Sequence, residues 1–526
     1  MLAIDAHDRE KIVAPLFRTS RAFVLLVLIL SALVAIGFAA YLRQLILGLG
    51  VTAMDRPVYW STYMVNFVFF IGISHAGTLI SAILRVTGAE WRRPITRVAE
   101  AITVFALMVG TLQIIIDMGR PDRLPFTILY GRLQSPILWD IVSVTVYFLS
   151  SVTYLYLPLM PDAAILRDNC PADAPAWQRK LYTVLALGWR GNHTQWVRLE
   201  KAIAVLAVLI IPVAVSVHSI ISWILATTVQ PGWHSTIFGP YFVIGAIFSG
   251  IGALFLAMTG VRKAMGLESY IGLRQYRNLG LLFIAMNAIW FYFTYAENLG
   301  IATGQQVEEF PVLATKLWGS FAPTFWTMVL MMAAAFWLLV VPQLVPAAAA
   351  RVPIFRPRLA LASAGTAAIL FGVIQRTPLT PTLAALDTAD ATTALWAGVI
   401  VLLMLAGLGV APWLKARPVA TTTIAGGLVL AGMWLERWNI IVPTMTHPRL
   451  IPYAVYTPSP TEILITIGSL ALFVLLFVVF FKFFPSVSIW EVAEGRALEA
   501  ARGPAVAAPA PKSPFTFGRR EWGARK

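Results

Sequence analysis

Long apolar stretches separated by short polar connections recur along the chain, from about residue 21 to about residue 484. A stretch of about 20 apolar residues is long enough to cross the hydrocarbon core of a bilayer as a helix. The pattern predicts twelve such helices, at about 21–48, 61–87, 97–118, 136–158, 199–227, 238–262, 275–299, 322–346, 358–376, 392–412, 419–441 and 461–484. The alternating segments of about 10 residues that are typical of a membrane barrel are absent from the sequence. We therefore predict an all-α, polytopic transmembrane bundle.

The composition supports a membrane protein. Of the 526 residues, 59% are hydrophobic and 12% are charged, whereas about 25% of the residues of a soluble domain are charged. The longest connection, 159–198, is polar and too short to form a core of its own. The chain is therefore divided into an N-terminal segment, eight helices, a further pair of helices, the last two helices and an Ala/Pro-rich basic tail, at 1–20, 21–346, 347–416, 417–484 and 485–526.

The net charge of +15 is distributed unevenly. Basic residues gather in alternate connections, for example Arg92, Arg93 and Arg97, whereas the connection at 226–240 contains no lysine or arginine. Connections rich in lysine and arginine stay in the cytoplasm, so both termini are predicted to be cytoplasmic. The basic excess is then a topology signal, and nucleic-acid binding is not predicted.

The chain has one cysteine, Cys170. One thiol excludes an internal disulfide, and it excludes a self-contained iron–sulfur cluster, which needs about four thiolates. If the protein takes part in redox chemistry, another molecule must therefore hold the metal.

Several ionisable residues interrupt the predicted helices, most of them toward the outer side. Such residues are costly in a bilayer and face the bundle interior or a wet cavity. They are His75, near the middle of the second helix, and Asp117, Asp140, His218, Glu297, Glu436 and Arg437. Histidine titrates near neutral pH and can accept and pass on a proton. Two imidazoles and several carboxylates toward one side of one bundle suit a site that takes protons from a ligand and releases them outward.

Each residue also has a structural interpretation. A lone buried histidine such as His75 is often bonded to a neighbouring backbone carbonyl. Adjacent charges such as Glu436 and Arg437 are also explained as helix-end residues. Asp117 and Asp140 are also explained by ion pairs with nearby arginines, which are Arg120, Arg123 and Arg132.

The histidines restrict the haem content that the chain can hold. His193, His234 and His447 lie in predicted connections, and no predicted helix carries two widely spaced histidines. A dihaem cytochrome b is therefore excluded, while a single haem between His75 and His218 stays open. An ion transporter also stays open, although no clear internal repeat or interrupted pair of helices supports it.

Six motifs surround these residues: ISHAGTLISAILRVTGAEWRRPITRVAE (73–100), MGRPDR (118–123), SPILWD (135–140), PVAVSVHSIISW (212–223), PGWHSTIFGPYFVIGAIFSG (231–250) and MWLERWNIIVP (433–443). They resemble the NrfD-like (polysulfide-reductase-type) integral membrane subunits. Within that family the chain is most similar to the quinol-binding subunit, ActC, of alternative complex III.

The resemblance implies a subunit of a quinol oxidoreductase complex in the cytoplasmic (inner) membrane. Such subunits bind quinol, with menaquinol favoured, near the outer face and hold no haem, iron–sulfur cluster or other metal. The implied partners are a peripheral iron–sulfur subunit on the outer face, haem c subunits, a second NrfD-like membrane subunit and membrane lipids.

Carried over residue by residue, the resemblance implies a quinol site at His75, Asp140 and His218, with Arg120 and Glu297 as further matches. Of these, His75 and Asp140 are the expected catalytic residues, and Asp117, Glu436 and Arg437 are expected on the proton path. The chain departs from the family pattern at Ile224, where an acid is often found. The resemblance also implies that the pair of helices at 347–416 is an insert, because the usual family member has about ten helices or fewer. Two related alternatives stay open: a quinone-reducing subunit of a polysulfide-reductase-type complex, and a structural subunit that has lost its quinone site.

Overall fold

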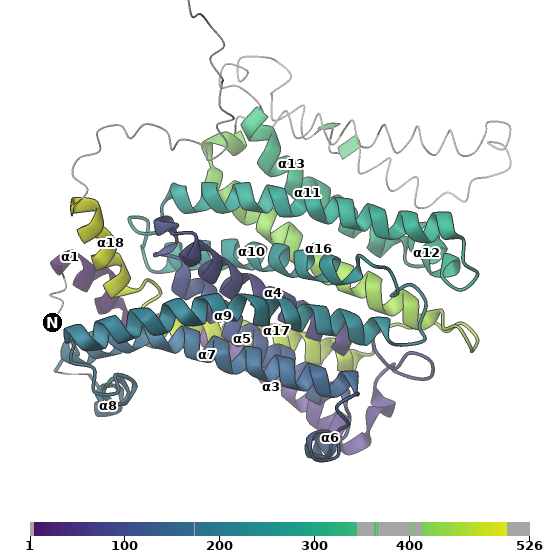
Figure 1. The fold of residues 1–526 in the computed structure, drawn as a ribbon, viewed down its shortest axis with the longest axis horizontal. Coiled ribbons are helices and arrows are strands. Elements are labelled where there is room, and N and C mark those ends of the chain that lie inside the picture. The colour runs from purple at the N-terminus through teal and green to yellow at the C-terminus, as the bar shows by residue number, and fades with distance from the viewer. Residues whose placement is uncertain are drawn as a thin grey trace, which may run out of the picture.

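The computed structural model describes residues 5–172, 174–344 and 413–501, together with positions 362, 363, 365, 366, 398 and 402. Ten long helices run along one common direction and form a bundle (Figure 1). They are α3 (Arg21–Leu47), α4 (Thr62–Val86), α5 (Thr96–Asp117), α7 (Pro136–Asp168), α9 (His193–Ala226), α10 (Phe238–Ala264), α11 (Leu273–Gly304), α13 (Ala322–Leu344), α16 (Pro418–Thr446) and α17 (Pro460–Phe483). The described residues contain no strand, so the all-α prediction is confirmed.

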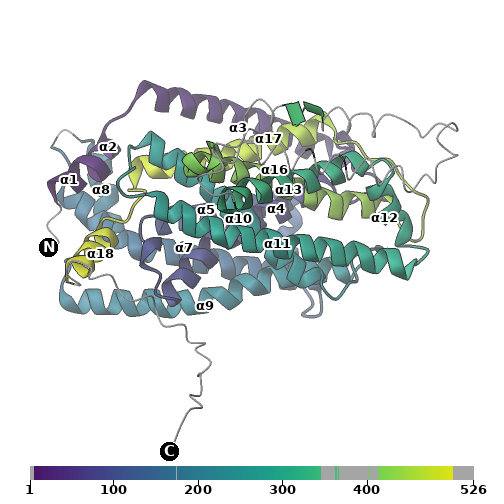
Figure 2. The ribbon, with the colours of Figure 1, turned by 90° about the horizontal axis from the view of Figure 1, so that it is seen from above.

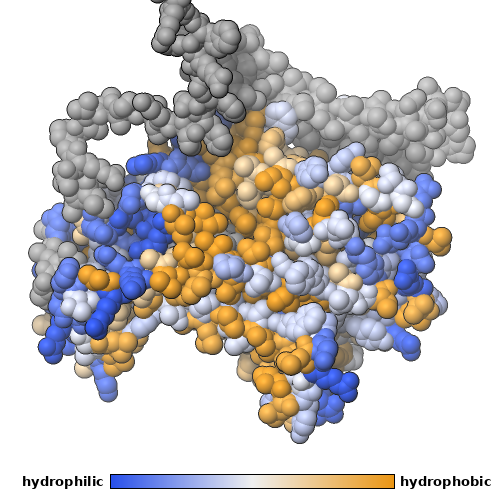
Figure 3. All heavy atoms as spheres, in the orientation of Figure 1, coloured by the Kyte–Doolittle hydropathy of each residue, from blue (hydrophilic) through white to orange (hydrophobic). Residues whose placement is uncertain are grey.

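These ten helices correspond to ten of the twelve predicted membrane helices. Within the described residues, nine helices are long and apolar enough to cross a membrane, and α4 is 25 residues long. The surface view has an apolar band across the middle of the bundle and hydrophilic residues at both ends (Figure 3). The chain is a multi-pass membrane protein. The predicted helices at 358–376 and 392–412 lie outside the described residues.

Short elements occupy both ends of the bundle (Figures 1 and 2). They are α1 (Ala6–Asp8), η1 (Arg9–Val13), α2 (Ala14–Phe17), η2 (Leu49–Val51), η3 (Glu90–Arg92), η4 (Pro121–Arg123), α6 (Leu124–Leu129), α8 (Ala176–Leu185), α12 (Phe310–Leu317) and α18 (Ile489–Ala501). We call the end that carries α1, α8 and α18 the basic end. The segments 5–17 and 489–501 meet there, since Arg496 Nη1 donates to Asp8 Oδ2 over 2.8 Å.

Helix α4 lies at the centre of the bundle, and its position decides where the functional residues meet. It packs against α5, α9, α10 and α16. Almost every described side chain from Tyr63 to Ser74 is buried, because the apolar residues of this helix cover its whole circumference. A helix that is apolar all round is a core helix rather than a lipid-facing one.

Glycines lie where two pairs of helices approach each other closely. A Cβ at Gly37 of α3 would lie 2.7 Å from the Cα of Gly468 in α17, and a Cβ at Gly426 of α16 would lie 2.8 Å from the Gly252 carbonyl oxygen in α10. Small residues let membrane helices approach closely where apolar burial against lipid gives no driving force. The glycines therefore contribute directly to the packing of the bundle.

The sequence pattern predicts that helix α7 ends at residue 158 and is followed by a polar connection. The structure corrects this prediction. Helix α7 continues through Pro158 and Pro161 to Asp168, and the connection contains α8. Internal prolines are tolerated in membrane helices when neighbouring groups supply the missing contacts. The end of α7 is also held by contacts with other segments, since the Pro158 carbonyl accepts from Arg97 Nη2 and from Trp490 Nε1, each over 2.9 Å.

The orientation of the bundle stays a prediction and has a direct test. With Cys170 replaced by serine, a cysteine at position 235 should react with a membrane-impermeant maleimide added outside the cell, because the connection that contains Ser235 is predicted to be external. A cysteine at position 87, at the basic end, is the control and should react only after the membrane is opened. The opposite labelling pattern would reverse the predicted topology.

Candidate functional site

Two histidines from different helices meet inside the bundle. His75 lies near the middle of α4 and His218 lies in α9, and both are 0% exposed. Their ring centroids are 4.0 Å apart, and Nδ1 of His218 lies 3.2 Å from Nε2 of His75. The two imidazoles are 143 residues apart in sequence, and they are brought together because α4 packs against α9.

Both nitrogens of His75 face backbone carbonyl oxygens. Nδ1 lies 2.7 Å from the Ile71 oxygen, and Nε2 lies 2.5 Å from the Ala214 oxygen. A neutral imidazole has one N–H and donates to one of these acceptors, whereas an imidazolium donates to both. An added proton on His75 would therefore find a hydrogen-bond acceptor already in place.

His218 differs because one of its nitrogens has no partner. Its Nε2 is buried and forms no hydrogen bond within the described residues. Leaving a buried polar atom unpaired costs about 1–3 kcal/mol, so such an atom in a folded protein requires an explanation. The structural interpretation of His75, a histidine bonded to carbonyls, describes its contacts, but it does not explain the second imidazole or this open nitrogen.

Aromatic residues line the pair on two sides. The ring of Tyr147 in α7 lies 4.8 Å from that of His75, and its hydroxyl donates to the Ser74 carbonyl oxygen over 3.1 Å. The ring of Phe242 in α10 lies 6.4 Å from that of His218. Neither aromatic residue is distinctive in the sequence, because each lies inside an apolar run that is typical of ordinary packing.

Asp140 lies on the same helix as Tyr147, seven residues earlier, and both side chains are buried. Seven residues of α-helix rise about 10 Å, which places Asp140 about two turns from Tyr147 along α7. Its Oδ1 is buried without a hydrogen-bond partner among the described residues, and it forms no ion pair with the described arginines. The alternative that Asp140 pairs with a nearby arginine is therefore wrong for this structure.

Glu436 and Arg437 form a second buried group beside the histidines. Each residue is 1% exposed, and α16 continues for nine residues beyond Arg437. Arg437 Nη1 donates to Glu436 Oε2 over 2.5 Å, and Trp290 Nε1 donates to Glu436 Oε1 over 2.5 Å. The Arg437 guanidinium lies 5.0 Å from the centroid of the Phe242 ring. The interpretation of these charges as helix-end residues is wrong, since they belong to the core.

The remaining predicted residues lie apart from the histidine pair. Arg120 is 63% exposed and pairs with Asp122 over 2.9 Å, and Glu297 near the end of α11 accepts a hydrogen bond from Ser235. Asp117 ends α5, and its buried Oδ1 has no partner among the described residues. The structure does not bring these three residues together with the imidazoles, and their roles stay predictions.

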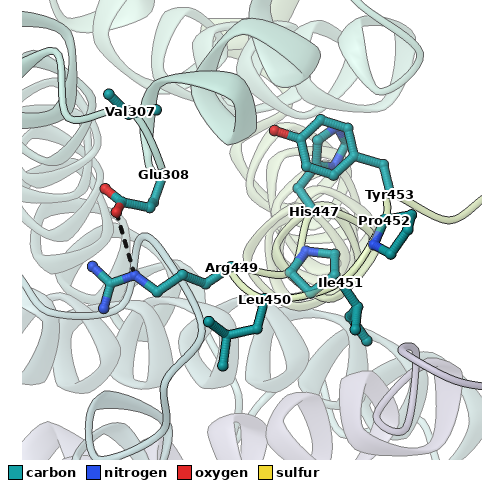
Figure 4. A pocket seen from close by; sticks show the side chains of 9 residues that line it. Val307, Glu308, His447, Arg449, Leu450, Ile451, Pro452 and Tyr453 are labelled. Carbon is teal, nitrogen blue, oxygen red and sulfur yellow. Dashed lines mark ion pairs between the residues drawn. The ribbon is translucent and has the colours of Figure 1, made fainter.

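A pocket of about 480 Å³ lies beside the start of α12 (Figure 4), and α12 lies at the opposite end of the bundle from the basic end (Figure 1). His447, Arg449 and Tyr453 line it from one connection, and Glu308 lines it from another, 3.7 Å from Arg449 Nε. Burial lowers the pKa of the His447 imidazole below its ordinary value. The pocket contains none of the predicted site residues, and it is not the site of the histidine pair.

The described residues contain no group of three or more histidine, cysteine, aspartate or glutamate side chains that could hold a metal ion. The described cluster has the groups for proton exchange with a bound molecule. Two imidazoles in hydrogen-bond contact, one of them with an open nitrogen, suit that role.

Comparison with known proteins identifies the family. The family model described as "Polysulphide reductase, NrfD" matches residues 50–376, which is more than half of the chain. The chain belongs to the NrfD family. This result confirms the family-level resemblance seen in the motifs, while the finer resemblance to the alternative complex III subunit stays a prediction.

Three relatives of this NrfD-family chain are named as subunits of oxidoreductases. The chain is 29% identical over 232 residues to a Halobacterium salinarum protein named as a dimethyl sulfoxide reductase membrane subunit; the alignment covers 43% of this chain and 49% of the relative. It is 25% identical over 233 residues to a selenate reductase subunit of Mesobacillus selenatarsenatis, covering 42% and 53%. It is 24% identical over 278 residues to the Hdr-like menaquinol oxidoreductase integral membrane subunit of Archaeoglobus fulgidus, covering 52% and 59%. The chain thus spans about half the length of the curated relatives it matches.

Proposed function

We propose that this chain is the quinol-binding membrane subunit of an electron-transfer complex. The observation that carries the proposal is the contact between His75 and His218 inside the bundle, with the open Nε2 of His218 beside it. A quinol hydroxyl is a donor, and a neutral imidazole nitrogen is an acceptor, so the hydroxyl pairs with His218 Nε2. Membership of the NrfD family, and a relative named as a menaquinol oxidoreductase subunit, support menaquinol as the substrate.

The contacts of the two rings suggest a proton relay. The quinol loses two electrons and two protons when it is oxidised. The proposed relay carries one of these protons, which passes from one hydroxyl to Nε2 of His218 while the Nδ1 proton of His218 passes 3.2 Å to Nε2 of His75. The second proton leaves from the other hydroxyl to water. His75 then donates to both the Ile71 and the Ala214 carbonyl oxygens. A base held in hydrogen-bond reach of the proton it accepts is the requirement for general base catalysis.

Asp140 is proposed as the group that receives the proton from the histidines on its way out. It lies on the buried face of α7 that also carries Tyr147, and its unpartnered Oδ1 is able to accept a hydrogen bond. The gap of about 10 Å between the two positions on the helix requires water molecules to complete the path.

The electrons need acceptors outside this chain. We propose that they leave one at a time to the iron–sulfur cluster of a peripheral subunit on the outer face of the cytoplasmic membrane. In the finer assignment the complex is alternative complex III, with haem c subunits and a second NrfD-like membrane subunit. Cys170 as the one cysteine supports the use of a partner's metal.

Quinone reduction is the second candidate function. Two relatives are named as subunits of reductases, and the same histidine relay operates in either direction. The direction is set by the reduction potentials of the partner subunits, so the neighbours that co-purify with this chain distinguish the candidates. Haem c partners favour quinol oxidation by alternative complex III, and a molybdenum subunit favours a reductase complex.

Quinol binding by the assembled complex tests the proposal. His218→Phe keeps an aromatic ring of similar size but removes the open nitrogen, so we expect the Kd for a menaquinol analogue to rise at least about tenfold, a cost of about 1.4 kcal/mol. The matched control is His234→Phe, because His234 is exposed in a connection, where its Nδ1 bonds to the Ala226 carbonyl oxygen. Binding is measured by titration of the purified complex in lipid nanodiscs. Equal affinity in the wild type and in both variants would exclude the histidine pair as the quinol site.

A further inference from the structure

The Arg437 guanidinium is buried inside the bundle, and neighbouring side chains fix its position. Glu436 directs one carboxylate oxygen to Arg437 and the other to Trp290 of α11. The two side chains thus form a dipole, with the carboxylate toward α11 and the guanidinium toward α4 and α10, where it lies over Phe242. A charge at this depth is costly in a membrane protein, which makes a functional role the default hypothesis.

Gly245 provides the space for this guanidinium, and Gly72 marks where α4 passes beside it at ordinary van der Waals distance. A Cβ at Gly245 of α10 would lie 2.8 Å from Arg437 Nη2 and 3.2 Å from Nη1. A Cβ at Gly72 of α4 would lie 3.8 Å from Nη2. Real Cβ atoms essentially never approach another atom within 3.0 Å, so any side chain at position 245 would displace the guanidinium. Gly72 is three residues from His75, on the same helix.

We propose that Gly245 is a positioning residue that places the Arg437 guanidinium beside the histidine pair as the fixed positive charge of the quinol site. The inference rests on the proposed function. When the ring hydroxyl gives up its proton to His218, negative charge develops on its oxygen, and a fixed cation stabilises that charge. Phe242 links the two groups, since its ring contacts both His218 and Arg437. Preorganised charge in a site that excludes water is worth far more than in bulk water, because no solvent has to reorganise.

The orientation of the Glu436–Arg437 ion pair is also fixed. Each carboxylate oxygen of Glu436 accepts a hydrogen bond, one from Arg437 and the other from Trp290, so the carboxylate cannot turn toward the histidines without breaking these bonds. The site therefore presents the positive end of the pair. A quinone or quinol with partial negative charge on its oxygen is the ligand class that this arrangement favours.

A double-mutant cycle tests whether Gly245 acts through Arg437. Gly245→Ala should lower kcat for menaquinol oxidation per assembled complex about tenfold or more and leave KM nearly unchanged, because the charge acts on the transition state. The atoms in its way are the flexible ends of Arg437 and Met433, so the backbone should keep its place. In an Arg437→Gln background the same substitution should cost less than about twofold, since coupled residues are not additive.

The matched control is Gly260→Ala, in the same helix, where a Cβ would meet nothing within 4 Å. It should leave kcat and assembly unchanged. Additive losses in the cycle, or a Gly245→Ala complex with wild-type kcat, would overturn the inference. If instead the His218→Phe complex binds the menaquinol analogue normally, the proposed function fails. The two failures are therefore distinguishable.

Discussion

Replacing Asp162 with alanine should destabilise the protein by about 3–5 kcal/mol, enough to prevent assembly of the complex. Asp162 is fully buried in α7, and its Oδ2 accepts from Arg97 Nη1 over 2.5 Å. The same carboxylate accepts from the backbone amides of Ile489 and Trp490 at the start of α18. Removing one partner of a buried ion pair leaves the other charge uncompensated, which is the costly case. Here the loss also leaves the first amides of α18 without an acceptor.

The neighbouring pair between Arg167 and Asp168 supplies the matched control. It has similar geometry, with Arg167 Nε 2.8 Å from Asp168 Oδ1, but its side chains are partly exposed. Exposed pairs contribute about 0–1 kcal/mol, so Asp168→Ala should be nearly neutral. The fraction of each variant that stays monodisperse in detergent after heating measures the difference. If the Asp162→Ala protein stays monodisperse after heating to the same extent as the Asp168→Ala protein, the Arg97–Asp162 ion pair does not hold α18 on the bundle.

Arg97 and Asp162 also indicate why part of the fold was not predictable. The sequence pattern places a helix end at residue 158, because the apolar run stops there and a polar connection follows. The carbonyl of Pro158 accepts from Arg97 and Trp490, which are 61 and 332 residues away in sequence. Contacts at such separations are not visible in a local pattern. Where the contacts are local the prediction succeeds, as at the start of α17, which Ser459 and Glu462 cap.

The start of α9 is an intermediate case. The apolar pattern predicts the helix from about residue 199 and leaves His193 in a connection. That placement of His193 is wrong, because α9 begins at His193 and so carries both His193 and His218, and Asn192 and Gln195 form a capping box there. That motif is present in the sequence and would have placed the start correctly. The difference arises because the first turns of the helix are polar and project beyond the apolar band.

The sequence predicts which residues belong to the candidate site, but it does not predict how their side chains are arranged in space. An imidazole inside an apolar run is conspicuous, so His75 and His218 were found from the sequence. Their contact depends on how α4 and α9 are rotated about their axes, and helical periodicity leaves that rotation undetermined when a helix is apolar all round, as α4 is. Trp290, which holds Glu436, carries no signal at all, because a tryptophan in a membrane helix is ordinary.

Replacing His75 with alanine should reduce menaquinol oxidation at least about tenfold per assembled complex. A positioned general base contributes about 10²–10⁴ in rate, and His75 is the second base of the proposed relay, with its two nitrogens already facing the Ile71 and Ala214 carbonyl oxygens. Without His75, no acceptor lies within hydrogen-bond reach of His218 Nδ1 at that position, so the Nδ1 proton of His218 cannot pass on. His193→Ala is the control, since His193 lies at the exposed start of the helix that also carries His218.

Turnover must be divided by the content of assembled complex, because the alternative interpretation makes His75 a packing residue. In that case the alanine variant should lose assembly, through the cavity left beside Tyr147 and the two freed carbonyl oxygens, while each complex that does form turns over normally. His75→Gln helps to separate the two interpretations: its amide nitrogen still donates to a carbonyl and fills much of the volume, but it cannot accept the proton. The relay predicts a glutamine complex that assembles well and turns over slowly. A glutamine complex with wild-type turnover would show that His75 takes no part in proton transfer.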